Sequence, residues 1–171
     1  MTNEDKQLLL TDLCGRLPYS VKGKVYAEVT NGNYDIMGDM IFYDAPFDVI
    51  LDNINTSTEE IHVSAIGNED TYEFLDNQQT DGEPYVLEDF EPYLRPLNSM
   101  TDEEKHELQE LTKEELSEFG RFIKNGHGLS LDGLYMFDKL RQLHWLNANH
   151  FDYRGLIEKG LALVAPKGIY E

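Results

Sequence analysis

The residues best suited to chemistry include a stretch that begins like a zinc-protease helix. His106-Glu107-Leu108-Gln109 supplies the first four positions of the His-Glu-x-x-His pattern, in which two histidines on one helix face bind the metal. The fifth position is Glu110, so the second imidazole ligand is missing. The stretch therefore indicates a charged, exposed helix face and predicts no metal site.

Residues 77–88 follow the spacing of a calcium-binding loop. Gly82 stands where such a loop turns sharply, and Glu88 stands at the position of the bidentate carboxylate. Asn77 and Gln79 are neutral where stronger ligands are usual, and no helix clearly flanks the loop. Weak condensation of cations on an acidic surface is favoured over a specific calcium site.

Three further residues, His144, His150 and Asp152, have the side chains of an acid–base or metal group. His144 falls on the apolar face of a predicted helix, which favours a hydrogen-bonded histidine in the core. The sequence contains no recognisable nucleophile elbow and no glycine-rich phosphate loop. We therefore expect no catalytic residue, no metal and no cofactor. The single cysteine, Cys14, is expected to be a small buried group.

Charge is the most unusual property of this sequence. Between Lys24 and Arg95 there is no lysine or arginine, but there are 17 acidic residues, and the chain as a whole carries −19. Such a segment repels nucleic acids and anionic membranes and attracts basic surfaces. We expect it to bind a basic protein surface through an acidic face, with these candidate residues: Asp52, Glu59, Glu60, Glu69, Asp70, Asp76, Asp81 and Glu83.

Compartment and solubility follow from three observations. A secretory signal has a basic region followed by an apolar core, and the N-terminal residues have neither. The longest apolar run, residues 161–165, is far shorter than the roughly 20 residues that span a bilayer. One cysteine cannot form an internal disulfide. We expect a soluble, cytoplasmic protein that does not enter membranes.

The first 99 residues read as a helix followed by short strands. Residues 3–14 form an amphipathic helix that Gly15 is placed to end. Asn31-Gly32-Asn33 predicts a hairpin turn, and further strands are expected over residues 47–51, 61–66 and 85–87. Short strands at this spacing predict a small antiparallel barrel of SH3-like size, or a strongly bent sheet.

From residue 100 the pattern becomes helical. Thr101-Asp102-Glu103-Glu104 is a capping box, and a long helix is expected over residues 131–148. We expect four of the apolar residues in this region to be buried together: Phe119, Phe122, Leu140 and Trp145. The fold class is therefore α+β, with a helix plus acidic β-rich unit over residues 1–99 and a helical unit over residues 100–171 packed against it.

Three stretches together resemble a family of proteins from gut bacteria and their phages or prophages. They are LLTDLCGRLPY at residues 9–19, PYLRPLNSMT at residues 92–101 and HFDYRGLIEKGLA at residues 150–162. The family carries no established activity, so the resemblance implies a cytoplasmic protein of possible phage origin and transfers no site residue. Residues 25–90 depart most from the family pattern.

The sequence leaves three functions open. The first is a non-enzymatic interaction protein whose carboxylates stand in for phosphates on the basic surface of a nucleic-acid-binding protein. The second is a structural or accessory module that forms an oligomer, with its acids serving only solubility. The third, a hydrolase or metal enzyme, is disfavoured because no motif supports it.

Overall fold

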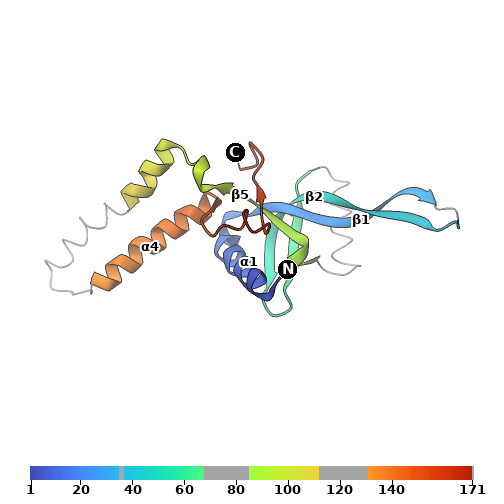
Figure 1. Ribbon diagram of the computed structural model, residues 1–171, viewed down its shortest axis with the longest axis horizontal. Coiled ribbons are helices and arrows are strands. Elements are labelled where there is room, and N and C mark those ends of the chain that lie inside the picture. The colour runs from blue at the N-terminus through green and yellow to red at the C-terminus, as the bar shows by residue number, and fades with distance from the viewer. Residues whose placement is uncertain (35–36, 68–84, 112–130, 171) are drawn as a thin grey trace. The chain divides into compact units, whose positions relative to one another are not determined.

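The computed structural model describes residues 1–34, 37–67, 85–111 and 131–170 (Figure 1). The chain divides into two compact units, one of residues Met1–Leu94 with Arg154–Glu171 and the other of residues Arg95–Tyr153. The fold class is α+β, as the sequence predicted. Residues 154–170, which we expected within the helical unit, belong to the first unit.

Helix α1, Asn3–Arg16, opens the first unit. Thr2 caps it, because its hydroxyl oxygen accepts a hydrogen bond from the Asp5 N–H at 3.1 Å. The helix continues through Gly15, and the 3₁₀ turn Leu17–Tyr19 follows it directly. Glycine costs a helix only about 1 kcal/mol, and the buried Arg16 beyond it extends the contacts of the last turn.

The strands of the first unit form an open, mixed sheet in the order β4-β3-β2-β1-β5, with β7 beside β5. Their bounds are Lys22–Tyr34 for β1, Met40–Asn55 for β2, Glu60–Ala65 for β3, Tyr85–Val86 for β4, Phe90–Pro96 for β5 and Leu163–Val164 for β7. The pairs from β4 to β5 are antiparallel, and β5 with β7 is parallel.

The predicted SH3-like barrel is wrong, because the described strands do not close on themselves. The prediction divided one long strand into short pieces. The strand expected over residues 47–51 is part of β2, which begins at Met40 and includes Pro46, paired with Tyr26. Proline is tolerated at a sheet edge, and among the described strands β3 pairs with β2 only from Val49 onward.

The predicted turn at Asn31-Gly32-Asn33 is also wrong. These residues continue β1, and the hairpin register shifts between Thr30 and Tyr34, as at a β-bulge. The chain reverses between Tyr34 and Met40 instead. In the described structure, residues 26–34 of β1 and 40–46 of β2 therefore pair only with each other, and we call this two-stranded segment the ribbon (Figure 1).

The core of the first unit lies between α1 and one face of the sheet. Leu9 and Leu13 of α1 are fully buried and cluster with apolar residues from every long strand. The chain after residue 154 completes the cluster, mainly through Leu156 and Leu161. Burying each such side chain contributes about 1.5–3 kcal/mol. Along β1, core residues alternate with outward residues, so the opposite face of the sheet receives the polar side chains.

In the described part of the second unit, an arginine packs with two aromatic rings. Its described elements are the 3₁₀ turn Leu97–Ser99, helical residues 102–111, helix α4 at Leu131–Ala148 and strand β6 at Phe151–Asp152. The Arg95 guanidinium lies 4.2 Å from the centre of the Phe151 ring, which stacks on Trp145 at 5.6 Å. Arg95 also pairs with Glu104 at 2.8 Å and 3.0 Å.

The predicted capping box is confirmed, because the Glu104 carboxylate accepts the Thr101 N–H and the Thr101 hydroxyl accepts the Glu104 N–H. Other expectations of burial differ from the structure. Leu140 is 46% exposed, and Trp145 is half-buried against Phe151. Phe119 and Phe122 lie outside the described residues.

Candidate functional site

Three of the eight predicted acidic residues lie in the described structure, and each has a local partner. Glu59 pairs with Lys6 of α1, which also pairs with Glu88. Glu60 accepts a hydrogen bond from the Thr58 hydroxyl at 2.6 Å. Asp52 accepts one from the Ser64 hydroxyl. The other five predicted residues, Glu69, Asp70, Asp76, Asp81 and Glu83, fall outside the described residues.

The ion pairs around Lys6 reduce the charge of this end of the sheet. The Lys6 ammonium beside Glu88 holds the pKa of that carboxyl below its usual range. The same two carboxylates, Glu59 first, raise the pKa of Lys6. Glu59 and Glu88 are thus bound to α1 of their own unit, and they are poorer candidates for docking than carboxylates without a cation.

A different set of carboxylates gathers on the face of the sheet opposite the core, which we call the outer face. The hairpin register pairs Lys24 with Asp48 and Glu28 with Asp44, and β5 places Glu91 beside Lys24. Directly paired residues project to the same side of a sheet. The outer face therefore carries these acids: Glu28, Asp44, Asp48, Asp52 and Glu91, with Asp52 placed there by its bond to Ser64.

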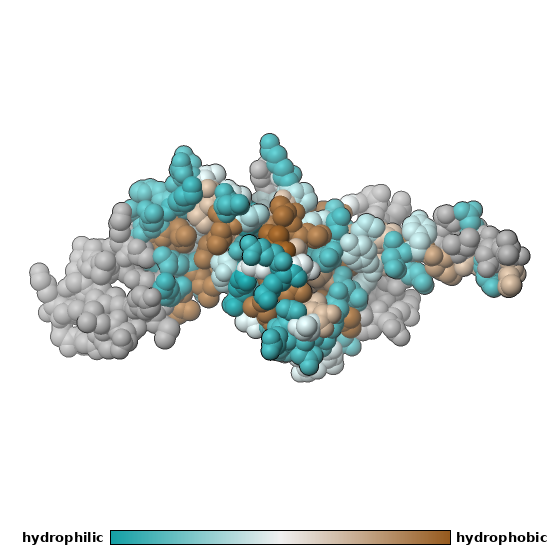
Figure 2. All heavy atoms as spheres, in the orientation of Figure 1, coloured by the Kyte–Doolittle hydropathy of each residue, from teal (hydrophilic) through white to brown (hydrophobic). Residues whose placement is uncertain are grey.

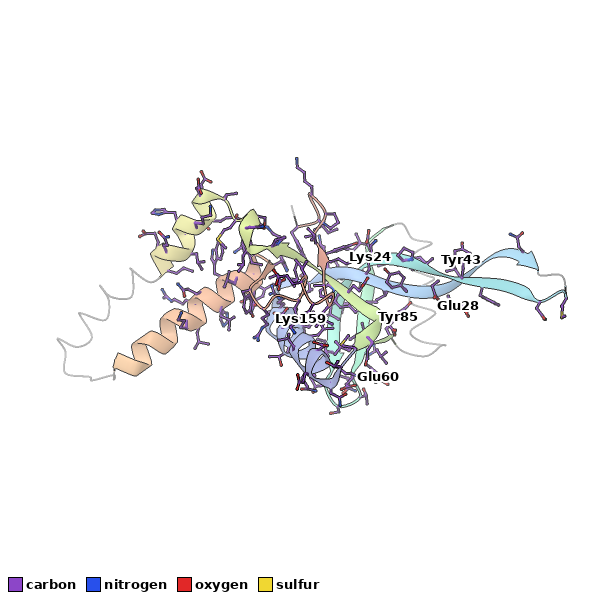
Figure 3. All side chains as sticks on the ribbon, in the orientation of Figure 1. Lys24, Glu28, Tyr43, Glu60, Tyr85 and Lys159 are labelled. Carbon is purple, nitrogen blue, oxygen red and sulfur yellow. The ribbon has the colours of Figure 1, made fainter. Side chains whose placement is uncertain are left out.

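Two lysines of β1 share this face, but one of them is already engaged. The Lys22 ammonium donates to the Ile169 carbonyl and lies 5.6 Å from the centre of the Tyr170 ring. Lys24 lies where the ribbon joins the rest of the sheet (Figure 3). Acids therefore outnumber bases on the described outer face, and the imbalance grows toward the ribbon.

Tyrosine hydroxyls hold two of these carboxylates in place. The Tyr93 hydroxyl donates to Asp48 Oδ1 at 2.6 Å, and the Tyr26 hydroxyl donates to Glu91 Oε2 at 3.1 Å. Burial, followed by the hydrogen bond to Asp48, raises the pKa of Tyr93 well above its usual range. The hydrogen bond to Glu91 raises the pKa of Tyr26. Both phenols therefore remain donors at neutral pH.

Two large aromatic side chains of the ribbon are exposed on the outer face. Tyr26 is 45% exposed and Phe42 is 51% exposed, while Glu28 and Asp44 are exposed between them. Tyr43 lies on the other side of the ribbon, since it pairs with Val29 (Figure 3). Figure 2 shows hydrophilic and hydrophobic residues side by side along the ribbon.

The histidines do not assemble a metal or acid–base site in the described structure. His106 is exposed, with its Nδ1 atom 3.8 Å from the Glu110 carboxylate. His144, expected in the core, is exposed, whereas His150 and Asp152 are buried. Across the described residues, no three histidine, cysteine, aspartate or glutamate side chains are grouped as metal ligands would be.

Two other chemical candidates are accounted for by their positions. Glu88, the last residue of the calcium-like spacing, is paired with Lys6, while Asn77 and Gly82 lie outside the described residues. Cys14 is exposed near the end of α1, contrary to expectation. The adjacent Leu13 is fully buried, so the face of α1 that packs on the core includes Leu13 and excludes Cys14.

No protein-family model, curated protein or solved structure matches this chain. Among the described helices, none is both long and apolar enough to cross a membrane.

Sequence reasoning missed the outer-face residues of the ribbon, among them Glu28 and Asp44. The signal available was the absence of any lysine or arginine between Lys24 and Arg95, but it did not show which carboxylates share a face. That information lies in the hairpin register.

Proposed function

We propose that this protein is a non-enzymatic interaction protein that docks on a basic partner through the outer face of its sheet. The observation that carries the proposal is the gathering of carboxylates from β1, β2 and β5 on one side of the sheet, away from the core. A field of one sign over one face steers a basic partner and favours one orientation of binding.

Nucleic-acid mimicry is the specific form of docking that we favour. Asp44 and Asp48 are four residues apart on β2, so their Cα atoms are about 13 Å apart at about 3.3 Å per residue. Glu28 and Glu91 add charge on the neighbouring strands β1 and β5. The carboxylates of this face would bind in a basic groove in place of the phosphates of a nucleic acid, and the bound protein would occlude the groove. The resemblance to phage proteins supports an antagonist of a host enzyme.

The test compares two variants of equal net charge. The outer-face variant carries Glu28→Lys, Asp44→Lys and Asp52→Lys. The control variant carries three reversals at other exposed positions: Glu103→Lys, Glu107→Lys and Glu158→Lys. Each reversal adds two charges, so both variants change from −19 to −13.

The immobilised proteins are incubated with lysate of the source cells, and the retained proteins are identified by mass spectrometry. We expect the wild type and the control variant to retain the same basic proteins at 0.1 M salt and to release them at 1 M. Screening shortens the reach of the field from about 10 Å to about 3 Å over that range. The outer-face variant should retain none of them. Equal retention by both variants would show that the outer face does not carry the docking.

A further inference from the structure

The outer face of the ribbon combines exposed rings with exposed carboxylates, and this combination restricts its partner. In the described structure the ribbon strands pair only with each other. Tyr26 and Phe42 are about half exposed on this face, and neither belongs to the hydrophobic core of the unit. Aromatic residues are enriched at protein–protein interfaces, so two exposed rings on one face of a ribbon point to an interaction surface.

Between the two rings lies a pair of like charges. Glu28 and Asp44 are directly opposite in the register, which puts their Cβ atoms about 4.5–5.5 Å apart. Neither carboxylate forms an ion pair within the described residues, and the nearest lysine along β1, Lys24, is four residues away. At about 3.3 Å per residue that is about 13 Å. Directly opposed like charges destabilise a hairpin, so this pair favours a cation supplied from outside.

The rings flank the carboxylates on opposite sides. Tyr26 precedes Glu28 by two residues and Phe42 precedes Asp44 by two residues, so all four side chains lie on the same face. Because the strands are antiparallel, Tyr26 lies toward the body of the sheet and Phe42 toward the tip of the ribbon. The hydrogen bond from Tyr26 to Glu91 fixes the inner ring.

Resting on the proposed function, we propose that these four residues form a docking site for an arginine side chain of the basic partner. A guanidinium is planar and presents several N–H donors, so it can bind a carboxylate pair while its faces stack on aromatic rings. An ammonium has one strongly hydrated charge and no face to stack. The arrangement therefore selects arginine over lysine.

A second copy of this chain is a poorer occupant than a basic protein. Residues 25–48 contain five acids, Glu28, Asp35, Asp39, Asp44 and Asp48, and no lysine, arginine or histidine. Two ribbons packed against each other would place these carboxylates together with no cation from either ribbon.

The test measures the affinities of a hexa-arginine and a hexa-lysine peptide by isothermal titration calorimetry at 0.1 M salt, with amide chemical shifts locating the site. The two peptides carry equal charge, so long-range attraction contributes equally to both. Stacking on exposed rings should make hexa-arginine about five to ten times tighter. The largest shifts should fall on residues 26–30 and 42–46.

Variants separate the rings from the charges. Phe42→Leu keeps an apolar side chain without the aromatic face, and it should reduce the arginine preference to about twofold or less while leaving hexa-lysine binding unchanged. Glu28→Gln with Asp44→Asn should weaken both peptides about tenfold. The matched controls are Leu97→Ala for loss of exposed apolar surface and Glu103→Gln with Glu107→Gln for loss of charge. Neither should change the preference.

Several outcomes would overturn the arginine site: equal affinity for the two peptides, an undiminished preference in Phe42→Leu, or a dimer in light scattering that Phe42→Leu dissociates. Circular dichroism melting verifies that each variant is folded. The proposed function fails separately. The proposed function is contradicted if charge reversal of the outer face leaves retention of proteins from lysate unchanged. Loss of the arginine preference alone contradicts the arginine site and not the docking by charge.

Discussion

A buried ion pair in α1 provides the sharpest test of how the first unit is held together. Asp12 and Arg16 are both fully buried and lie one helical turn apart. Asp12 Oδ2 accepts a hydrogen bond from Arg16 Nε at 2.6 Å, and Asp12 Oδ1 accepts one from Arg16 Nη2 at 3.1 Å. Arg154 Nε lies 3.2 Å from the same Oδ1. Replacing Asp12 with asparagine keeps the shape of the side chain but removes the negative charge beside the buried Arg16 guanidinium.

We expect Asp12→Asn to lower the free energy of unfolding by about 3–5 kcal/mol, the usual cost of removing one partner from a buried pair. With a urea m-value of about 2 kcal/mol/M, the unfolding midpoint should fall by about 1.5–2.5 M. Near-ultraviolet circular dichroism of the tyrosines follows mainly the first unit, which holds eight of the ten. Fluorescence of Trp145 follows the second unit, so the two signals show where the variant acts.

Asp102→Asn is the control, because this carboxylate is 93% exposed and its pair with Lys105 is on the surface. It should cost well under 1 kcal/mol. A double variant, Asp12→Leu with Arg16→Met, should recover most of the lost stability, since apolar residues of similar volume replace a buried pair well. If Asp12→Asn and Asp102→Asn lower the midpoint equally, the buried pair does not stabilise the first unit.

Two further predictions concern the sheet and the C-terminal segment. Gly23→Ala should cost about 1–3 kcal/mol in urea unfolding, because an added Cβ would lie 2.5 Å from the Glu91 carbonyl oxygen and 2.6 Å from Phe90 Cζ; an unchanged midpoint would contradict this contact. Burial raises the pKa of Tyr170 to about 12, while an unfolded tyrosine ionises near 10. The neutral phenol therefore stabilises the fold fully below pH 10, and this contribution should be lost between about pH 10 and pH 12. In that window the free energy of unfolding should fall less steeply with pH for Tyr170→Phe than for the wild type. Equal slopes would count against the burial of Tyr170.

Features set by a few neighbouring residues could be predicted from the sequence. The capping box at Thr101 and Glu104 was found because both hydrogen bonds of the box join residues three positions apart. Strand β3 was placed correctly because buried and outward residues alternate along it. Such signals do not depend on where the rest of the chain lies.

Burial along the helices was harder to predict. Leu140 and His144 were assigned to a buried face of α4, yet both are exposed. Apolar residues surround more than half of this helix, so periodicity alone does not select the face that is covered. The neighbours that select it are distant in sequence. The same reason explains why Cys14, next to the buried Leu13, was predicted to be buried.

The acidic site shows most directly why charge pattern alone was insufficient. A turn centred on Gly32, as the Asn-Gly-Asn signal predicted, would have paired Glu28 with Ile36 and separated it from any other acid. The observed register pairs Glu28 with Asp44 and places Tyr26 and Phe42 on either side. The sequence therefore indicated how much negative charge the segment carries, while the position of one turn determined which carboxylates meet. That register brings like charges together at the exposed end of a sheet, where each strand has only the other as its described neighbour. The pair therefore does not stabilise the hairpin, and it is the feature on which the proposed docking depends.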